Sequence, residues 1–342
     1  MASVDVTVRG AGAFGLCIAW EAARRGAKVR VIEAQRIGAG SSGGLVGALS
    51  PHVPENWNPK KQFQLESLLM ADAFWSGVEQ VSGLSTGFGR VGRLQVLPNA
   101  AAVDLAHKRH ESAQSLWSGR AIWQVVPVSG TEWEPVSPSG WLVHDTLSAR
   151  LHPRLAAGAL VAAIRAKGGE VIEGLGLEEG LVVWATGLQG LRDLSADLGR
   201  QIGDGVKGQA ISIGFNAPNL PQIYADGLHI IPHVDGTVAI GSTSEHVWQT
   251  ESGTDAQLDT ILDRAVAALP ILAGAPVRER WAGVRPRAKT KSPILGAWPG
   301  RPGHFVANGG FKIGFGMAPK VATTLVDLVL EGRDTIPDGF RL

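Results

Sequence analysis

The first residues of the chain carry the pattern that most restricts its fold. An apolar stretch, Val4–Arg9, is followed by Gly10, Gly12 and Gly15 and then by an apolar run with helical spacing. In such a unit the first glycine allows a tight turn, the second lets a pyrophosphate approach bare backbone, and the third lets the helix lie close to the strand. The anion would then lie at the helix N-terminus, where free N–H groups and the helix dipole favour it. The stretch predicts a dinucleotide-binding unit.

A carboxylate, Glu33, ends the second strand of this unit, residues 28–33. A glutamate at this position can accept hydrogen bonds from both ribose hydroxyls of an adenosine. A 2′-phosphate would meet a like charge there, so the sequence disfavours NADP as the ligand.

The composition excludes several classes of protein. With 342 residues and a formal net charge of +1, the chain is long enough for two domains and has no bulk field to recruit nucleic acid or an anionic membrane. Cys17 is the only cysteine, which excludes a cysteine-based metal cage, and His107 and His110 lack a third ligand nearby, so we expect no metal site. The first strand begins near residue 4 and no apolar run reaches the ~18 residues that cross a bilayer, so we expect a cytoplasmic protein.

The order of helix and strand patterns predicts an α/β fold with two domains. The first domain has a Rossmann-like, three-layer architecture with a mostly parallel sheet, and the second has an antiparallel sheet that would contact the substrate. We expect helices at residues 64–80, 100–117, 153–167, 255–269 and 317–330, and strands at 92–98, 121–128, 170–173, 181–184, 206–215, 227–232, 236–243 and 305–307. The expected first domain comprises residues 1–80, 145–200 and 284–342, and the second comprises 81–144 and 201–283.

Further stretches complete a family pattern. They are Gly40–Pro51, Ala185-Thr186-Gly187, Leu228–Thr243 with Ser244-Glu245-His246, Trp281–Pro286 and Asn308–Pro319. Together with the opening unit they resemble the D-amino-acid oxidase and glycine oxidase family of flavoproteins, most closely its glycine-oxidase-like branch. The resemblance covers nearly the whole chain, and its last two stretches are the most specific.

The resemblance implies an FAD enzyme that oxidises an amine or amino acid by moving a hydride from the α-carbon to flavin N5, giving an imine that hydrolyses. It implies FAD held without a covalent bond, because no cysteine lies near the flavin loops. The implied cofactor-binding residues are Gly10, Gly12, Ala13, Phe14, Gly15, Glu33, Ala34, Ser41, Ser42, Val46, Gly47, Ala48, Leu177, Ala185, Gly187, Gly310, Phe311, Lys312, Ile313, Gly314, Phe315 and Gly316.

Three residues are candidates for a catalytic role. Arg285 matches the arginine that binds the substrate carboxylate in the family, and a guanidinium suits that role as a permanently charged, bidentate clamp. Lys312 matches a second substrate arginine of glycine oxidase and would add a cation at the pyrimidine end of the flavin. His52 follows the flavin loop in the sequence. It could act near flavin N5 as a proton shuttle, form a wall of the pocket, or be a loop residue without a role in catalysis. The basic residues 287, 289 and 291 form a solvated edge or line the pocket, and the second case predicts a substrate with more than one acidic group.

The partners implied are a small amine or amino acid and O2 or another electron acceptor, and a homo-oligomer is possible. A dehydrogenase, or one subunit of a heteromeric one, that uses another acceptor remains an alternative. So does a tRNA-modifying FAD oxidoreductase, because the loop Gly40–Pro51 also resembles that of a tRNA-wobble-uridine enzyme, although the balanced charge argues against nucleic-acid binding. A flavin-holding subunit without turnover is the third alternative.

Overall fold

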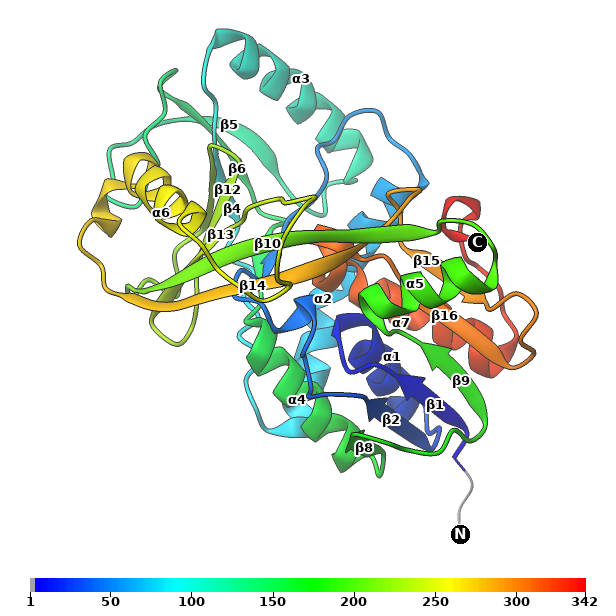
Figure 1. Ribbon diagram of the computed structural model, residues 1–342. Coiled ribbons are helices and arrows are strands. Elements are labelled where there is room, and N and C mark those ends of the chain that lie inside the picture. Colours follow the sequence, from blue (N-terminus) through cyan, green and yellow to red (C-terminus); the bar gives the residue numbers. More distant parts are fainter. Residues whose placement is uncertain (1–3) are drawn as a thin grey trace.

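A parallel sheet brings together segments that lie far apart in the sequence (Figure 1). In the computed structural model, which describes residues 4–342, this sheet has six strands, and only β15 pairs antiparallel to its neighbour. In spatial order they are β15 (Ile294–Ala297), β16 (His304–Asn308), β9 (Leu181–Trp184), β1 (Val6–Arg9), β2 (Val29–Glu33) and β8 (Glu170–Glu173). Val8 pairs with Val31 and Val183, and all three are fully buried, as expected for a parallel sheet covered on both faces.

A second sheet of eight strands is antiparallel except between β11 and β4. In spatial order its strands are β14 (Val277–Ala288), β10 (Gly203–Gly214), β13 (Thr237–Gly241), β12 (Leu228–Pro232), β11 (Gln222–Ala225), β4 (Arg93–Val96), β6 (Trp141–Asp145) and β5 (Trp123–Pro127). A two-stranded ribbon of β3 (Ala48–Leu49) and β7 (Ala149–Arg150) is separate from both sheets.

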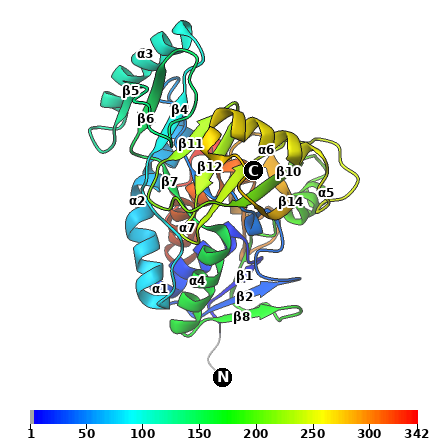
Figure 2. The ribbon, with the colours of Figure 1, turned by 90° about the vertical axis from the view of Figure 1, so that its left-hand side faces the viewer.

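The helices cover both sheets. Helices α1 (Ala13–Arg24), α2 (Pro59–Ser82), α4 (Pro153–Ala166) and α7 (Gly314–Glu331) pack against one another in the main core. Helix α5 (Gly187–Asp197) contacts β10 and β14, and α6 (Gln257–Ala268) buries its apolar face on β10, β12 and β13. Helix α3 (Ala100–Leu116) lies over β5 at the projecting end of the second sheet (Figure 2).

The structure confirms the α/β fold with one parallel and one antiparallel sheet, and it differs from the sequence expectations at several element ends. Helix α2 begins at Pro59 instead of residue 64, because the Asn58 side chain accepts a hydrogen bond from the Lys61 N–H and caps the helix there. Strand β14 was not expected as a strand, and it runs to Ala288, past the boundary placed between residues 283 and 284.

One helix bears on the expectation that no apolar run could cross a bilayer. Residues Phe311–Glu331 form one helical stretch that is long and apolar enough by length and composition. The most apolar part of this stretch is 61% buried, and α7 packs against α1 and α2. The core helix of a globular protein has the same length and apolar composition, so these two properties alone are weak evidence for a membrane span.

We expect Leu68→Ala to destabilise the protein strongly. Leu68 is fully buried on α2 and lies near Gly316 in the first turn of α7, so the substitution opens a cavity in the main core. The free energy of unfolding should fall by about 2–5 kcal/mol in urea denaturation. Leu175→Ala, at a fully exposed leucine, is the control and should change it by less than about 0.5 kcal/mol. Similar losses in the two variants would contradict this packing.

Candidate active site

The turn after β1 has room for glycine only. Gly10 has φ +99°, and a Cβ added there would lie 2.5 Å from the carbonyl oxygen of Ala185. A Cβ on Gly15 would lie 1.9 Å from the carbonyl oxygen of Gly10. The start of α1, the end of β1 and the end of β9 therefore meet with their backbones in direct contact. Ala185 and Gly187, two further residues expected to bind the cofactor, directly follow β9.

The N-terminus of α1 is open to an anionic group. Gly12 is its N-cap residue and supplies no side chain to cap the helix. A side-chain acceptor comes instead from the short helix Ser41–Gly43, where the Ser42 hydroxyl accepts a hydrogen bond of 2.9 Å from the Ala13 N–H. A Cβ on Gly12 would approach the same hydroxyl to 3.1 Å. The two segments expected to bind the cofactor thus lie against each other.

The Glu33 carboxylate lies beside this turn and is held by backbone. Its oxygens accept hydrogen bonds from the N–H groups of Ala11 (2.8 Å) and Gln35 (3.0 Å), and Ala34 is exposed next to it. Leu177 lies in the loop after β8 with 79% of its surface exposed, and its carbonyl oxygen accepts a hydrogen bond from Arg30. Its position at the adenine remains a prediction.

The closing glycine loop meets the opening one. A Cβ on Gly310 would lie 2.9 Å from the ring of Phe14, at the start of α1. The short helix Phe311–Ile313 leads into α7, whose first turn has no side-chain cap. Among residues 4–342, no side chain caps the N–H groups of Gly314, Phe315 and Gly316, and they suit an electron-rich group.

The loop that leads into β3 is packed tightly against the start of α4 and the antiparallel sheet. Gly47 has φ +60°, and a Cβ on it would lie 1.8 Å from the carbonyl oxygen of Leu151. Val46 lies against Gly241 of β13, and Ala48 pairs with Arg150 in the small ribbon. This places the segment Val46–Ala48 under the antiparallel sheet.

Arg285 of β14 is 8% exposed and lies on the face of the sheet next to Gly208, where a Cβ would collide with the guanidinium at 1.8 Å. Its guanidinium donates to the Ser242 hydroxyl (2.7 Å) and to the carbonyl oxygen of Thr243 (3.3 Å). Burial lowers the pKa of Arg285 to about 10, and the Coulomb interaction with Glu245 opposes that shift. The guanidinium therefore stays charged at neutral pH, with no carboxylate bound to it among residues 4–342.

Lys312 reaches the same segment from the closing loop. Its ammonium donates a hydrogen bond of 2.7 Å to the Ser244 hydroxyl. Burial lowers the pKa of Lys312, and the nearby Arg285 and Arg287 lower it further. The structure thus brings together two of the three catalytic candidates.

His52 has different partners. Its ring Nδ1 and its backbone N–H both contact the Gln64 side-chain oxygen on α2, and burial lowers the pKa of the ring. None of its hydrogen bonds reaches Arg285, Lys312 or the segment Ser242–Ser244. Its catalytic role stays a prediction.

His229 is a site residue that sequence reasoning missed. It lies opposite Gly241 in the pairing of β12 with β13 and opposite Tyr224 in β11, with the two rings 4.9 Å apart. Burial, with the charges of Arg93 and Lys312, lowers the pKa of His229 to about 3, so the ring is neutral. Its Nδ1 has no partner among the described residues. Strand alternation could have found it, because Leu228 and Ile230 face the core under α6 and leave His229 on the other face.

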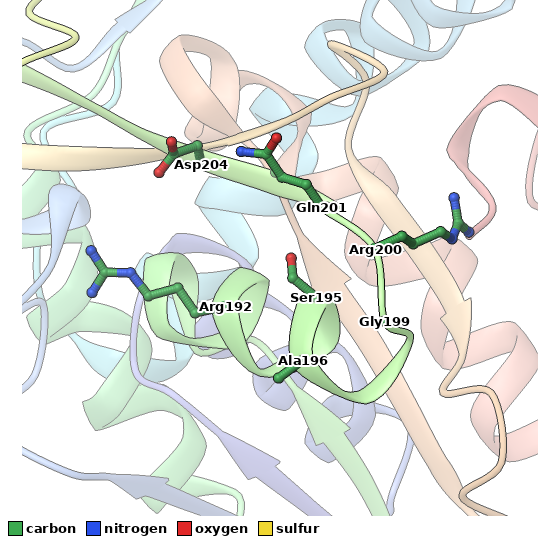
Figure 3. A pocket seen from close by; sticks show the side chains of 8 residues that line it. Arg192, Ser195, Ala196, Gly199, Arg200, Gln201 and Asp204 are labelled. Atoms are coloured by element: carbon green, nitrogen blue, oxygen red, sulfur yellow. The ribbon is translucent and has the colours of Figure 1, made fainter.

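A shallow hollow of about 500 Å³ lies at the end of α5, lined by Arg192, Ser195, Arg200 and Asp204 among others (Figure 3). Figure 3 shows the Arg192 and Arg200 side chains directed away from each other. None of the residues singled out above lines this hollow, so it is separate from the candidate site.

The residues present fit FAD. The glycine cradle at α1 suits a pyrophosphate, Glu33 lies at the end of β2 where a ribose would bind, and the uncapped start of α7 suits the pyrimidine edge of a flavin. A metal ion has no comparable site, because residues 4–342 contain no group of three His, Cys, Asp or Glu side chains placed to hold one.

Comparisons with known proteins agree with this assignment. The family model described as "DAO: FAD dependent oxidoreductase" matches residues 5–328. The chain is 27% identical over 354 residues to the bifunctional protein ThiO/ThiG of Nostoc sp., covering 96% of this chain but only 53% of that protein, so it spans about half of the relative's length. It is 28% identical over 365 residues to the glycine oxidase of Pseudomonas putida, covering 98% of this chain and 97% of that protein.

Two crystal structures have the same fold. Glycine oxidase from Geobacillus kaustophilus superposes with a TM-score of 0.83 and 22% identity, covering 98% of this chain and 96% of that one. Iminodiacetate oxidase from Chelativorans sp. BNC1 superposes with a TM-score of 0.85 and 20% identity, covering 98% of both chains.

We expect Gly15→Ala to weaken FAD binding. The added Cβ would lie 1.9 Å from the Gly10 carbonyl oxygen, so α1 must move away from the turn that receives the pyrophosphate. The Kd for FAD, measured by flavin fluorescence, should rise at least about tenfold, which corresponds to ~1.4 kcal/mol. Gly158→Ala on α4 is the matched control, because nothing lies within 4 Å of its added Cβ. Unchanged FAD affinity in Gly15→Ala would contradict the cradle.

We expect stability to fall on acidification partly through His233. Its Nε2 donates to the Leu45 carbonyl oxygen (2.8 Å), and burial, with the charge of His152, lowers its pKa to about 4. Between about pH 6.5 and 4 the unfolded chain therefore binds more protons than the folded protein. The free energy of unfolding decreases as the pH is lowered through this range, by up to ~1.4 kcal/mol per pH unit. His233→Gln, whose amide can donate the same bond, should have a shallower slope in urea denaturation. An unchanged slope would exclude His233 as a source.

Proposed function

The chain belongs to the FAD-dependent oxidoreductase family, and on this premise we propose that it oxidises the C–N bond of a small amino acid or secondary amine acid, giving an imine that hydrolyses. Arg285 carries the proposal: it is a buried guanidinium beside the flavin loops, and its partners within residues 4–342 are neutral oxygens. A substrate carboxylate would supply the missing anion through a bidentate, charge-assisted pair. The relatives named glycine oxidase and iminodiacetate oxidase act on compounds of this class by their names.

The residues of the chain position the substrate. Arg285 would hold the carboxylate, which fixes the carbon that faces the flavin. Tyr224 and the neutral ring of His229 would form the wall beyond Gly241, where the ring can accept or donate a hydrogen bond without adding charge. Bound FAD supplies the two-electron acceptor. Cys17, the single cysteine, is buried in α1, which supports a non-covalent cofactor.

We expect Arg285→Met to lower kcat/KM for carboxylate substrates about 100-fold with FAD retained, since each hydrogen bond to a charged group contributes about 1.5–3 kcal/mol. Anaerobic reduction of the flavin by glycine, sarcosine, iminodiacetate and D-amino acids measures this without assuming an acceptor. Arg278→Met, at an exposed residue of the same strand, is the control. Equal kinetics of Arg285→Met and wild type would remove the proposal.

The same preparations separate an oxidase from a dehydrogenase. An oxidase reoxidises rapidly in air and releases peroxide, and the proposal expects this outcome. Slow reoxidation in air with fast reoxidation by a quinone would assign the chain to the alternative, a dehydrogenase.

A further inference from the structure

Two cations of the candidate site are bound to one short segment by neutral groups alone. Arg285 donates to the Ser242 hydroxyl and the Thr243 carbonyl, and Lys312 donates to the Ser244 hydroxyl. The guanidinium comes from β14 and the ammonium from the loop before α7, so the fold brings them together from two directions.

A third cation lies beside them. Arg287, two residues after Arg285 on the same strand face, stacks over the Phe311 ring at 5.3 Å, and the Lys312 ammonium lies 5.7 Å from the same ring. The positive charges of both arginines repel the Lys312 ammonium and lower its pKa.

The carboxylates of this region are engaged elsewhere. Glu245 accepts hydrogen bonds from Thr243 and Gln209 and lies 3.5 Å from the Lys207 ammonium. Asp204 is the cross-strand neighbour of Arg287, but it is exposed, accepts from the Gly205 N–H and lies beyond ion-pair distance from Arg287.

The Asp145 carboxylate is bound to Arg93 at 2.9 Å. Within residues 4–342, no carboxylate forms an ion pair with Arg285, Arg287 or Lys312.

Like charges brought close together repel one another, most strongly where one of them is buried, as Arg285 is, and a bound anion relieves this repulsion. One carboxylate neutralises one of the two cations bound to Ser242–Ser244 and leaves the other. We propose that the site takes amino or imino acids with two acidic groups: Arg285 binds the carboxylate next to the carbon that is oxidised, and Lys312 binds the second. This inference rests on the proposed function, and it adds the substrate class.

The test compares acids that differ only in the second charge and are not oxidised. FAD-loaded protein is titrated with succinate against butyrate and with malonate against propionate, and binding is followed by the change in visible flavin absorbance. Wild type should bind the preferred dicarboxylate at least about tenfold more tightly than its monocarboxylate partner, as expected for one added charge-assisted pair.

The variants assign the second charge to Lys312. Lys312→Met and Lys312→Gln should remove the preference for the dicarboxylate by weakening dicarboxylate binding much more than monocarboxylate binding, whereas Lys312→Arg should keep the preference. Lys289→Met removes one positive charge at an exposed residue nearby and should leave both affinities unchanged. The absorbance ratio of flavin to protein confirms that each variant is loaded.

Two outcomes overturn the inference and leave the proposed function intact. One is equal affinity of wild type for dicarboxylates and monocarboxylates. The other is equal weakening of both acids by Lys312→Met, which would mean that both cations share one carboxylate. If neither kind of acid binds to wild type, the proposed function fails together with the inference.

Discussion

The structure depends on direct backbone contact at the carboxyl edge of the parallel sheet. At Gly10 and Gly15 no Cβ fits, because each would collide with a carbonyl oxygen, and the same turn touches Ala185 at the end of β9. Phe14, one residue before this contact, packs on Gly310 of the closing loop. Three segments from distant parts of the sequence thus meet where parallel strands end, which is where open α/β sheets bind their ligands. The backbone contacts set the shape of this cradle, and the Ser42 hydroxyl and the Glu33 carboxylate add hydrogen bonds to its N–H groups.

The antiparallel sheet contributes the charges. Arg285 is positioned by the pairing of β14 with β10, and Gly208 leaves the space for its guanidinium. The cost of holding a cation there is reduced by the hydrogen bonds that the guanidinium donates to neutral oxygens of Ser242 and Thr243, and among residues 4–342 no carboxylate is bound to it. Under the proposed function, this arrangement suits an anion and should disfavour neutral amines, because a substrate without an acidic group would leave the buried guanidinium without an anionic partner.

The local parts of the fold could be predicted from the sequence, and the assembled site only in part. The glycine turn, the start of α4 at Pro153 and the α/β class follow from short-range patterns, and the structure confirms them. Strand β14 could not be recognised, since it contains Gly283 and Pro286, and a proline is tolerated here because β14 is the edge strand of its sheet. His229 was not predicted as a site residue because its role depends on which face of β12 it occupies. That face is fixed by the register of β12 with β11 and β13, which are separate segments of the chain.

This division between the two sheets has a consequence for specificity. The cross-strand row of Ala210, Gly241, His229, Tyr224 and Gln95 spans five strands and faces the same side as Arg285. Gly241 is constrained, because a Cβ on it would lie 2.8 Å from Val46 of the flavin loop, whereas His229, Tyr224 and Gln95 lie farther along the row, away from the backbone contacts at Gly10 and Gly15. The small residues of the row, Ala210 and Gly241, lie near the guanidinium and leave room for a carboxylate. The larger polar residues, His229, Tyr224 and Gln95, lie farther away, where they would contact the rest of the substrate. The same cradle can therefore serve different amines, and fold alone does not fix the substrate.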